Sequence, residues 1–302
     1  MRILITGACG FIGNSICKLF HEKGYDVTGW DIMLRNKAWN LDYVDLLDEI
    51  QVYEKLVQVK PDVIIHCAGS ADVSKSVENP DADFRGNVTV THNLLFAVHK
   101  AGMDSIRFIF LSSAGVYGNP SSLPITESMP LNPLSPYALH KVMCENICLY
   151  FRKNYGLDAK IIRIFSAYGA GLRKQIFWDM YVKFKKSGAL NMFGTGEESR
   201  DYINVEDLIN AIFLITEKAP EQEVIYNVAN GEEITIREAA DFFALQCGIE
   251  SDRIHFSGEK REGDPINWLA DISKLKTLGY KKTVDMAEGL KKYVKWVEEL
   301  ND

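Results

Sequence analysis

Tyr137 and Lys141 stand four residues apart in a segment that is typical of the start of a helix. This spacing places both side chains on the same helix face, one turn apart. A lysine ammonium near a phenol favours the phenolate and can lower its pKa. The pair could then exchange the proton of a carbinol as it interconverts with a carbonyl. Tyrosine and lysine also share this spacing on ordinary helix surfaces, so the pair alone does not establish a catalytic site.

Two further hydroxyls, Ser112 and Ser113, follow an apolar strand predicted at residues 106–111. In a parallel sheet, ligands bind at the carboxyl ends of the strands, where these hydroxyls would lie. They could equally cap a turn. A proline-rich loop at residues 120–136 follows, too long for a simple connector, and it ends in a Ser-Pro pair that suits the first turn of a helix.

The chain opens with a short β-favouring run and then Gly7, Gly10 and Gly13, after which the apolar spacing becomes helical. A strand, a tight glycine turn and a helix present backbone amides to a diphosphate, although a glycine turn without ligand has the same pattern. Asp31 ends a second predicted strand, at residues 25–31. An acidic side chain at this distance accepts hydrogen bonds from an adenosine ribose and disfavours a 2′-phosphate. The combination favours NAD over NADP.

Strands and helices alternate through the first half of the chain, which predicts a parallel sheet covered on both faces. We therefore expect an α/β fold: a Rossmann-type doubly wound parallel sheet at residues 1–165, with a further strand near 224–228. A smaller mixed C-terminal region, residues 166–302, is expected mainly to bind substrate. Ala68 closes one strand among other small residues, which leaves room for a ligand or makes an ordinary turn. Further strands are predicted at 40–44, 63–66 and 159–165, and helices at 47–59, 87–101, 174–186 and 286–300.

The composition of the 302 residues is ordinary for a globular protein, with 47% hydrophobic and 25% charged residues. A net charge of −7 without a basic run argues against nucleic acid as a partner. Neither a signal-peptide pattern nor an apolar run of transmembrane length is present, so no membrane association is expected. Six cysteines without a CxxC pair predict reduced thiols, no metal site and a cytoplasmic protein.

Eight short motifs follow one another over nearly the whole chain. They are TGACGFIG at 6–13, Asp31, DL at 45–46, HCAG at 66–69, SSAGVYG at 112–118, YALHK at 137–141, RDYINVED at 200–207 and REGDP at 261–265. In this order and spacing they resemble the extended short-chain dehydrogenase/reductase family, in the NAD-dependent epimerase/dehydratase branch that acts on nucleotide sugars.

The resemblance implies that Ser113, Tyr137 and Lys141 form the catalytic set. Tyr137 would exchange the proton of a sugar hydroxyl while the nicotinamide takes or returns hydride at the same carbon. Ser113 would bind the reacting oxygen, and Lys141 would bind the nicotinamide ribose. The glycine turn would meet the diphosphate, Asp31 the ribose, and the Asp-Leu pair at 45–46 the adenine. The residues expected to bind NAD are Gly7, Gly10, Phe11, Ile12, Gly13, Asp31, Asp45, Leu46, Ala68, Tyr137 and Lys141.

The same resemblance places a nucleoside-diphosphate sugar on the C-terminal region. Arg200 and Arg261 would lie near its phosphates, unless they pair with neighbouring aspartates, and Phe193 would lie against its base. Trp268 stands where the family uses side-chain bulk to limit the sugar pocket, which argues against a bulky N-acetyl group. The residues expected to bind substrate are Ser113, Tyr137, Ser166, Arg173, Phe193, Arg200, Arg261 and Trp268.

Two departures from the family pattern bear on the reaction. Family dehydratases resemble one another in an Asp-Glu pair just after the catalytic hydroxyl, where this chain has Ala114 and Gly115, so a dehydratase is not expected. Members commonly have asparagine where this chain has Ser166, and Arg173 or Lys174 is expected to compensate for it at the phosphate.

The resemblance implies a nucleotide-sugar epimerase acting at C4 through a transient 4-keto sugar. An NAD(P)H-dependent reductase of a 4-keto-6-deoxy nucleotide sugar is the alternative, and a non-catalytic nucleotide-binding relative is a third. A homodimer through a four-helix bundle is expected, formed by the helices at Asn87 and Tyr137. Leu94, Leu95, Val98, Ile147 and Tyr150 could supply its apolar face or belong to the core.

Overall fold

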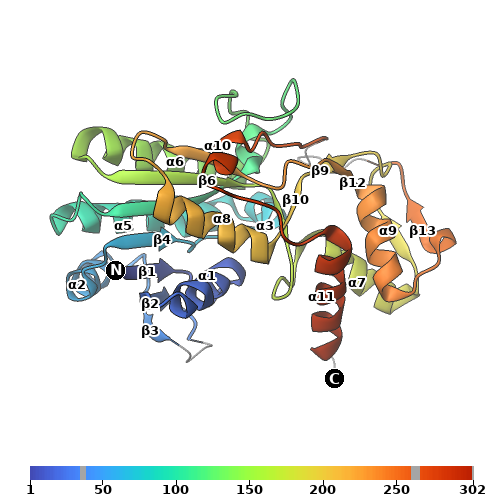
Figure 1. Cartoon of the computed structure of the whole chain (residues 1–302), viewed down its shortest axis with the longest axis horizontal. Coiled ribbons are helices and arrows are strands. Elements are labelled where there is room, and N and C mark those ends of the chain that lie inside the picture. Colours follow the sequence, from blue (N-terminus) through green and yellow to red (C-terminus); the bar gives the residue numbers. More distant parts are fainter. Residues whose placement is uncertain (35–38, 260–265, 301–302) are drawn as a thin grey trace.

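The computed structural model describes residues 1–34, 39–259 and 266–300. Its centre is a seven-stranded sheet in the order β11-β6-β5-β4-β1-β2-β3, with every neighbouring pair parallel (Figure 1). This order confirms the predicted Rossmann-type sheet, because the chain winds outward in both directions from β1. The strands are β1 (Arg2–Thr6), β2 (Asp26–Asp31), β3 (Asn40–Tyr43), β4 (Val63–His66), β5 (Arg107–Ser113), β6 (Asp158–Ile164) and β11 (Ile225–Val228).

Helices cover both faces of this sheet, and each face has its own apolar core. Within β1, Ile3 and Ile5 pack into one core while Leu4 packs into the other, as the alternation of a strand requires. On the first face lie α1 (Phe11–Glu22) and α8 (Val205–Lys218), which Figure 1 shows in front of the sheet. On the second lie α2 (Glu49–Val59), α5 (Val90–Lys100) and α6 (Pro136–Tyr155).

The turn between β1 and α1 depends on two glycines. Gly7 has a φ of +66°, and a Cβ there would lie 2.7 Å from the amide nitrogen of Ala68. A Cβ on Gly13 would lie 2.1 Å from the carbonyl oxygen of Gly7. Any side chain would therefore push the start of α1 away from the sheet.

The helix that carries Tyr137 begins where its sequence predicts. The Ser135 hydroxyl accepts a hydrogen bond from the amide of Ala138 (3.2 Å), and Pro136 occupies the first turn. The helix ends at Gly156, which adopts the left-handed conformation. These caps set where α6 starts and so which of its residues face the end of β5.

The helix predicted at 87–101 differs at its start, because residues Arg85–Thr89 form a π-helical turn before α5. Such a turn inserts an extra residue and is frequent at functional sites. Two short helices, α3 (Val73–Glu78) and α4 (Pro80–Phe84), precede it. Leu94, Leu95 and Val98 are fully buried in the sheet core, so the structure assigns them to the core and not to an interface.

The C-terminal part forms a separate core, to the right of the sheet in Figure 1. Its helices are α7 (Gln175–Ser187), α9 (Ile236–Cys247) and α11 (Met286–Glu299), and a short α10 (Ser273–Thr277) packs near β11. Because α8, β11 and α10 return to the sheet, the second half of the chain serves both parts. The remaining strands pair in twos: β7 (Ser166–Tyr168) with β10 (Tyr202–Asn204), β9 (Ser199–Arg200) with β12 (Ile234–Thr235), and β8 (Leu190–Met192) with β13 (Ile254–Phe256).

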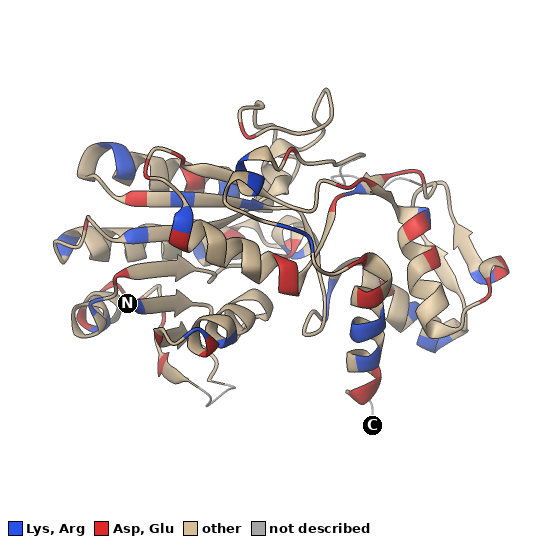
Figure 2. Ribbon diagram, in the orientation of Figure 1, with Lys and Arg blue, Asp and Glu red and all other residues tan. Residues whose placement is uncertain are grey.

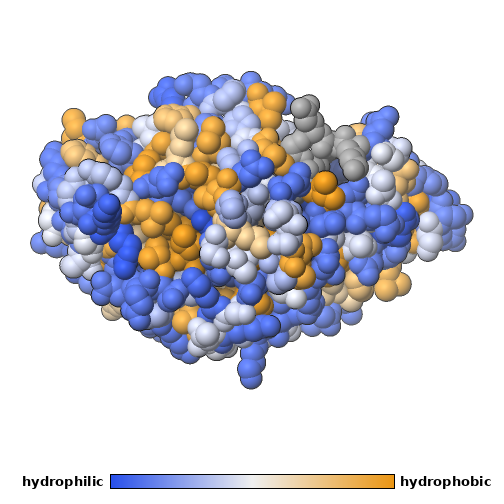
Figure 3. Space-filling view, turned by 90° about the horizontal axis from the view of Figure 1, so that it is seen from above, coloured by the Kyte–Doolittle hydropathy of each residue, from blue (hydrophilic) through white to orange (hydrophobic). Residues whose placement is uncertain are grey.

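Basic and acidic residues are interspersed along the helices and strands drawn in Figure 2. Along α11, Lys292 pairs with Glu288 and also with Glu206 of α8. From above, hydrophobic residues gather over the sheet half of the molecule, and the end with α9 and β13 is more hydrophilic (Figure 3). No helix in the described ranges combines the length and the apolar composition needed to cross a membrane.

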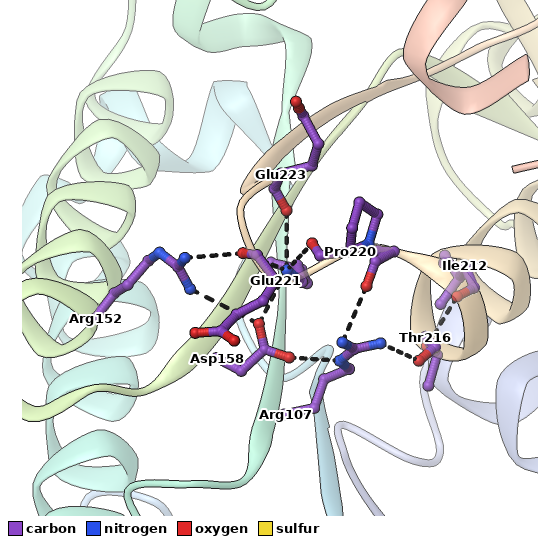
Figure 4. A network of polar contacts seen from close by, with 10 residues as sticks. Arg107, Arg152, Asp158, Ile212, Thr216, Pro220, Glu221 and Glu223 are labelled. Atoms are coloured by element: carbon purple, nitrogen blue, oxygen red, sulfur yellow. Dashed lines mark hydrogen bonds and ion pairs between the residues drawn. The ribbon is translucent and has the colours of Figure 1, made fainter. Parts of the chain in front are cut away.

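At the amino ends of the strands, a polar network closes the bottom of the sheet (Figure 4). Arg107 donates to Asp158 (2.7 Å) and to two carbonyl oxygens at the end of α8. Lys160, completely buried, donates to three carbonyl oxygens of residues 220–223 at 2.7–3.0 Å and pairs with Asp158. The network joins β5, β6 and the loop after α8. It lies at the end of the sheet opposite the carboxyl ends of the strands.

Candidate active site

A cavity of about 230 Å³ lies at the carboxyl ends of the central strands. Segments that are distant in the sequence meet there: the glycine turn after β1, the segment after β4, the end of β5, the start of α6, the end of β6 and the segment before α7. This is the edge at which open α/β sheets bind ligands. The predicted site residues in its lining are Gly7, Gly10, Phe11, Ile12, Gly13, Ser113, Tyr137 and Lys141.

Tyr137 and Lys141 lie one turn apart on α6, and both are nearly buried, at 9% and 6% exposed. The Lys141 ammonium lies 5.8 Å from the centre of the Tyr137 ring and donates a hydrogen bond to the carbonyl oxygen of Leu111 (3.0 Å). Burial, and then the charge of Lys141, lower the pKa of His66 to about 3, so this histidine is neutral. Lys141 forms no ion pair with the residues that the structure describes. Its charge is therefore available to the phenol and to a ligand.

The two serines at the end of β5 serve different purposes. Ser113 lines the cavity, and its hydroxyl oxygen accepts a hydrogen bond from the amide of Gly115 (3.1 Å), which caps the 3-10 turn Ala114–Tyr117. The predicted cap is thus present, and the hydroxyl proton remains available to donate. Ser112 donates to the carboxylate of Glu145 on α6 (2.6 Å). Both serines line the cavity, but the Ser112 hydroxyl is engaged with Glu145 and so anchors the strand to the helix.

Asp31 closes β2 beside the glycine turn. Its two carboxylate oxygens accept hydrogen bonds from the amides of Cys9 and Met33, each at 2.9 Å. The side chain is thereby held at the sheet edge next to the turn. Among the described residues, no side chain caps the start of α1, whose first residues line the cavity. Open amides at a helix N-terminus, with a fixed carboxylate one strand away, fit the diphosphate and the ribose of a dinucleotide.

Residues 3–229 match the model of the NAD dependent epimerase/dehydratase family. This stretch contains all of the sheet except its first residue, Arg2, and every segment that lines the cavity. The chain belongs to this family. It is therefore an NAD-dependent enzyme, and the resemblance seen in its motifs is confirmed.

Individual relatives match over the full length. A UDP-glucose 4-epimerase of Mycolicibacterium smegmatis is 32% identical, covering 98% of both chains. A solved UDP-glucose 4-epimerase of Thermotoga maritima with UDP-glucose superposes with a TM-score of 0.91 at 27% identity, covering 100% of both chains. A UDP-glucuronic acid 4-epimerase of Bacillus cereus, in complex with UDP-glucuronic acid and NAD, gives 0.89 at 27% identity, covering 99% of this chain and all of the other.

The other residues predicted to bind NAD lie outside the lining of the cavity. The Asp45 carboxylate accepts a hydrogen bond from the amide of Leu47 (2.9 Å). Leu46 is buried, and its carbonyl oxygen accepts a hydrogen bond from the side chain of Asn93. Ala68 follows β4, where its amide donates to the Thr6 hydroxyl (3.3 Å). Their contacts with the adenine half of the cofactor stay predictions.

Replacing Asp31 by asparagine tests the predicted choice of cofactor. We expect NAD to bind about 10–100-fold more weakly, because hydrogen bonds to a charged group are worth about 1.5–3 kcal/mol. The preference for NADH over NADPH should also shrink, since a 2′-phosphate would no longer face a carboxylate. Titration with both reduced nucleotides measures this. Asp26→Asn, at the opposite end of the same strand, is the control, and an unchanged preference in Asp31→Asn would refute the assignment.

At the proposed sugar end, the structure distinguishes two adjacent cations. Arg173 and Lys174 are both exposed, but only Lys174 lines the cavity. Ser166 begins β7, and its chain neighbours Phe165 and Ala167 line the cavity while Ser166 does not. The compensation expected for Ser166 at a sugar-nucleotide phosphate stays a prediction.

The remaining substrate candidates lie beyond the cavity wall. Trp268 packs edge-on against Phe165 and donates to the carbonyl oxygen of Gly118 (3.0 Å), and the Arg200 guanidinium lies 5.6 Å from its ring centre. Arg200 also donates to backbone carbonyl oxygens, and Phe193, directly after β8, is 46% exposed. Arg261 lies outside the described residues.

The aspartate expected as a partner of Arg200 has a different role. Asp201 is completely buried and accepts hydrogen bonds from the amides of Asn230, Gly231 and Ala270 at 3.0–3.1 Å. Burial raises the pKa of Asp201 to about 7, although these amides act in the opposite direction. The Asp201 carboxylate therefore ties three segments together from a buried position, and is not the surface partner of Arg200 that is the alternative to phosphate binding.

Sequence reasoning missed Asn87, which lies in the π-helical turn. Its side-chain oxygen is buried and accepts no hydrogen bond from any residue in the described ranges. A Cβ on Gly69 would lie 2.7 Å from this oxygen and 3.6 Å from the Lys141 ammonium, so Asn87 lies close to the cavity lining. An unpaired buried amide oxygen here suits a hydroxyl of a bound ligand. The sequence does not single out Asn87, because the same helical segment contains other polar residues, among them Asn93.

Proposed function

We propose that this enzyme interconverts UDP-hexoses that differ in configuration at C4, through a transient 4-keto sugar. The observation that carries the proposal is one cavity lined by Ser113, Tyr137, Lys141 and the glycine turn. The 4-epimerase names of the relatives, from two sugar classes, support the same reaction at C4. A reductase that consumes NAD(P)H is not favoured by these relatives.

NAD, when bound, accepts and returns a hydride at C4. The residues of this chain would handle the proton: the Tyr137 oxygen would take the proton of the C4 hydroxyl and, after the 4-keto sugar has turned its other face to the cofactor, return it to the C4 oxygen. Ser113 donates its free hydroxyl proton to the reacting oxygen. Lys141 stabilises the phenolate as a nearby buried cation and offers N–H groups to a ribose hydroxyl.

Incubation of the purified enzyme with UDP-glucose is expected to give UDP-galactose without net formation of NADH. Because an epimerase regenerates its own cofactor, denatured protein should release near-stoichiometric NAD. UDP-glucuronic acid should be assayed in parallel, since relatives act on both sugars. Chromatography of the sugar nucleotides measures the products. Stoichiometric consumption of NADH or NADPH by a 4-keto sugar, without epimer formation, would replace this proposal by the reductase.

We also propose that the enzyme forms a homodimer through α5 and α6. The faces of these helices opposite the core carry apolar side chains that are 43–55% exposed, at Phe96, Leu139 and Tyr150. Two such pairs of helices would form a four-helix bundle and cover these side chains.

A cytoplasmic location stays a prediction.

A further inference from the structure

Lys174 connects two parts of the cavity wall that are remote in the sequence. It lies directly before α7, and its ammonium donates a hydrogen bond to the carbonyl oxygen of Ala71 (3.0 Å), in the segment after β4. The next residue, Gln175, has a φ of +66°, which is rare for a residue with a side chain. Both Lys174 and Gln175 line the cavity. The strained backbone at Gln175 thus lies next to Lys174, whose side chain extends from the start of α7 to the segment after β4.

The charge around this ammonium is unbalanced. Lys174 forms no ion pair with any residue in the described part of the chain, and its one hydrogen bond there is to a neutral carbonyl group. The acidic group that acts on the Lys174 charge is Asp72. Its carboxylate already accepts a hydrogen bond from the amide of Lys75 and caps α3. Desolvation is the main cause that lowers the pKa of Lys174, and the charges of Lys75 and Lys141 lower it further. An anion bound beside Lys174 would stabilise its ammonium and so offset both the desolvation and the repulsion by the two other lysines.

The glycine turn is the place in this cavity where an anion is expected. The segment before α7 lies against it, since a Cβ on Gly171 would be 3.2 Å from the ring of Phe11. The turn offers backbone amides but no cation. Among the described lining residues the cations are Lys141 and Lys174, and none is acidic. Lys141 is held at the end of β5 beside Tyr137, which leaves Lys174 as the cation for the turn.

We propose that Lys174 binds the diphosphate of NAD and, by spanning from α7 to the segment after β4, holds the cofactor in the enzyme between turnovers. The proposal rests on the NAD dependence of the family and not on which sugar is used. Because Lys174 approaches from the C-terminal part of the chain, cofactor retention would depend on both parts. A sugar nucleotide also carries a diphosphate, so the experiment must separate the two ligands.

Lys174→Met removes the charge, and Lys174→Arg keeps it. We expect Lys174→Met to lose most of its NAD during extended dialysis and to bind NADH about 10–100-fold more weakly, as expected for losing a charge-assisted hydrogen bond. Lys174→Arg should retain NAD. Adenosine, which has no phosphate, should bind both variants equally, because the effect concerns the diphosphate alone. Fluorescence titration and the nucleotide released on denaturation give these values without any activity assay.

Lys186→Met is the matched control, because Lys186 is an exposed lysine near the end of the same helix. It should retain NAD like the unmodified chain. Unchanged NADH affinity in Lys174→Met would overturn the proposal. So would a raised KM for the UDP-sugar at full NAD content, since Lys174 would then serve the substrate. Thermal unfolding of the NAD-free variants tests whether they are folded. If Lys174→Met is not folded, Lys174→Gln takes its place: loss of NAD from it would support the proposal, and full retention of NAD would overturn it.

Discussion

Tyr137→Phe is expected to lower kcat for epimerisation by about 10²–10⁴-fold, the usual contribution of a positioned acid or base. The ring would still fill its buried place on α6, so the fold and the bound NAD should be retained. Only the hydroxyl that exchanges a proton with C4 is lost. The measurement is the initial rate of UDP-galactose formation from UDP-glucose, together with the NAD released by the denatured variant.

Tyr155→Phe is the appropriate control, because Tyr155 ends the same helix and stacks on His99 far from the cavity. It should epimerise at the normal rate. If Tyr137→Phe kept full turnover, the catalytic role of Tyr137 would be wrong. Another residue would then transfer the proton, or the reaction would not take place in this cavity. Loss of turnover with full NAD content would exclude a mere defect in cofactor binding.

Those features of the site that depend on local chemistry could be predicted from the sequence. The glycine spacing predicts the turn because Gly7 and Gly13 have no room for a Cβ. The Ser-Pro pair predicts the start of α6, and the spacing of four then places Tyr137 and Lys141 on one face. These inferences use neighbours in the chain, so they do not require the tertiary structure.

Features that depend on packing between remote segments could not be predicted in this way. The apolar side chains of α5 were equally compatible with a core and with an interface, and only the position of the sheet shows that Leu94 is buried. The sequence gives no signal for Asn87, and it indicates Lys174 only as one of two neighbouring cations at a phosphate. Their significance comes from a π-helical turn and from a hydrogen bond to Ala71 across the cavity. Sequence spacing carries no signal for contacts of this kind.

The largest effect on stability is expected from a buried ion pair behind the cavity. The Arg163 guanidinium on β6 donates two hydrogen bonds to the Glu145 carboxylate on α6, at 3.0 and 2.7 Å. Arg163 also donates to the Tyr117 hydroxyl (2.9 Å), and Ser112 donates to the same carboxylate. Both charged side chains are at most 4% exposed. Each charge therefore depends on its partner for the solvation that water would otherwise supply.

Arg163→Met is expected to lower the free energy of unfolding by about 3–5 kcal/mol, because it leaves the Glu145 carboxylate buried without a counter-ion. Adding Glu145→Leu should recover much of this loss, since the unpaired charge is then gone. Urea denaturation of the single and double variants measures both effects. Lys292→Met is the control, because its exposed pair with Glu206 should contribute only about 0–1 kcal/mol.

The double variant also separates stability from the arrangement of the site. Glu145 lies one turn beyond Lys141 on α6, and Ser112 precedes Ser113 on β5, so the pair ties together the two elements that carry the proposed catalytic residues. With both charges removed, the fold should be stable while the Ser112 hydroxyl loses its partner. A reduced kcat in that stable double variant would indicate that the network positions α6 against β5. If the double variant were as unstable as Arg163→Met, the unpaired carboxylate would not be the cause of the loss.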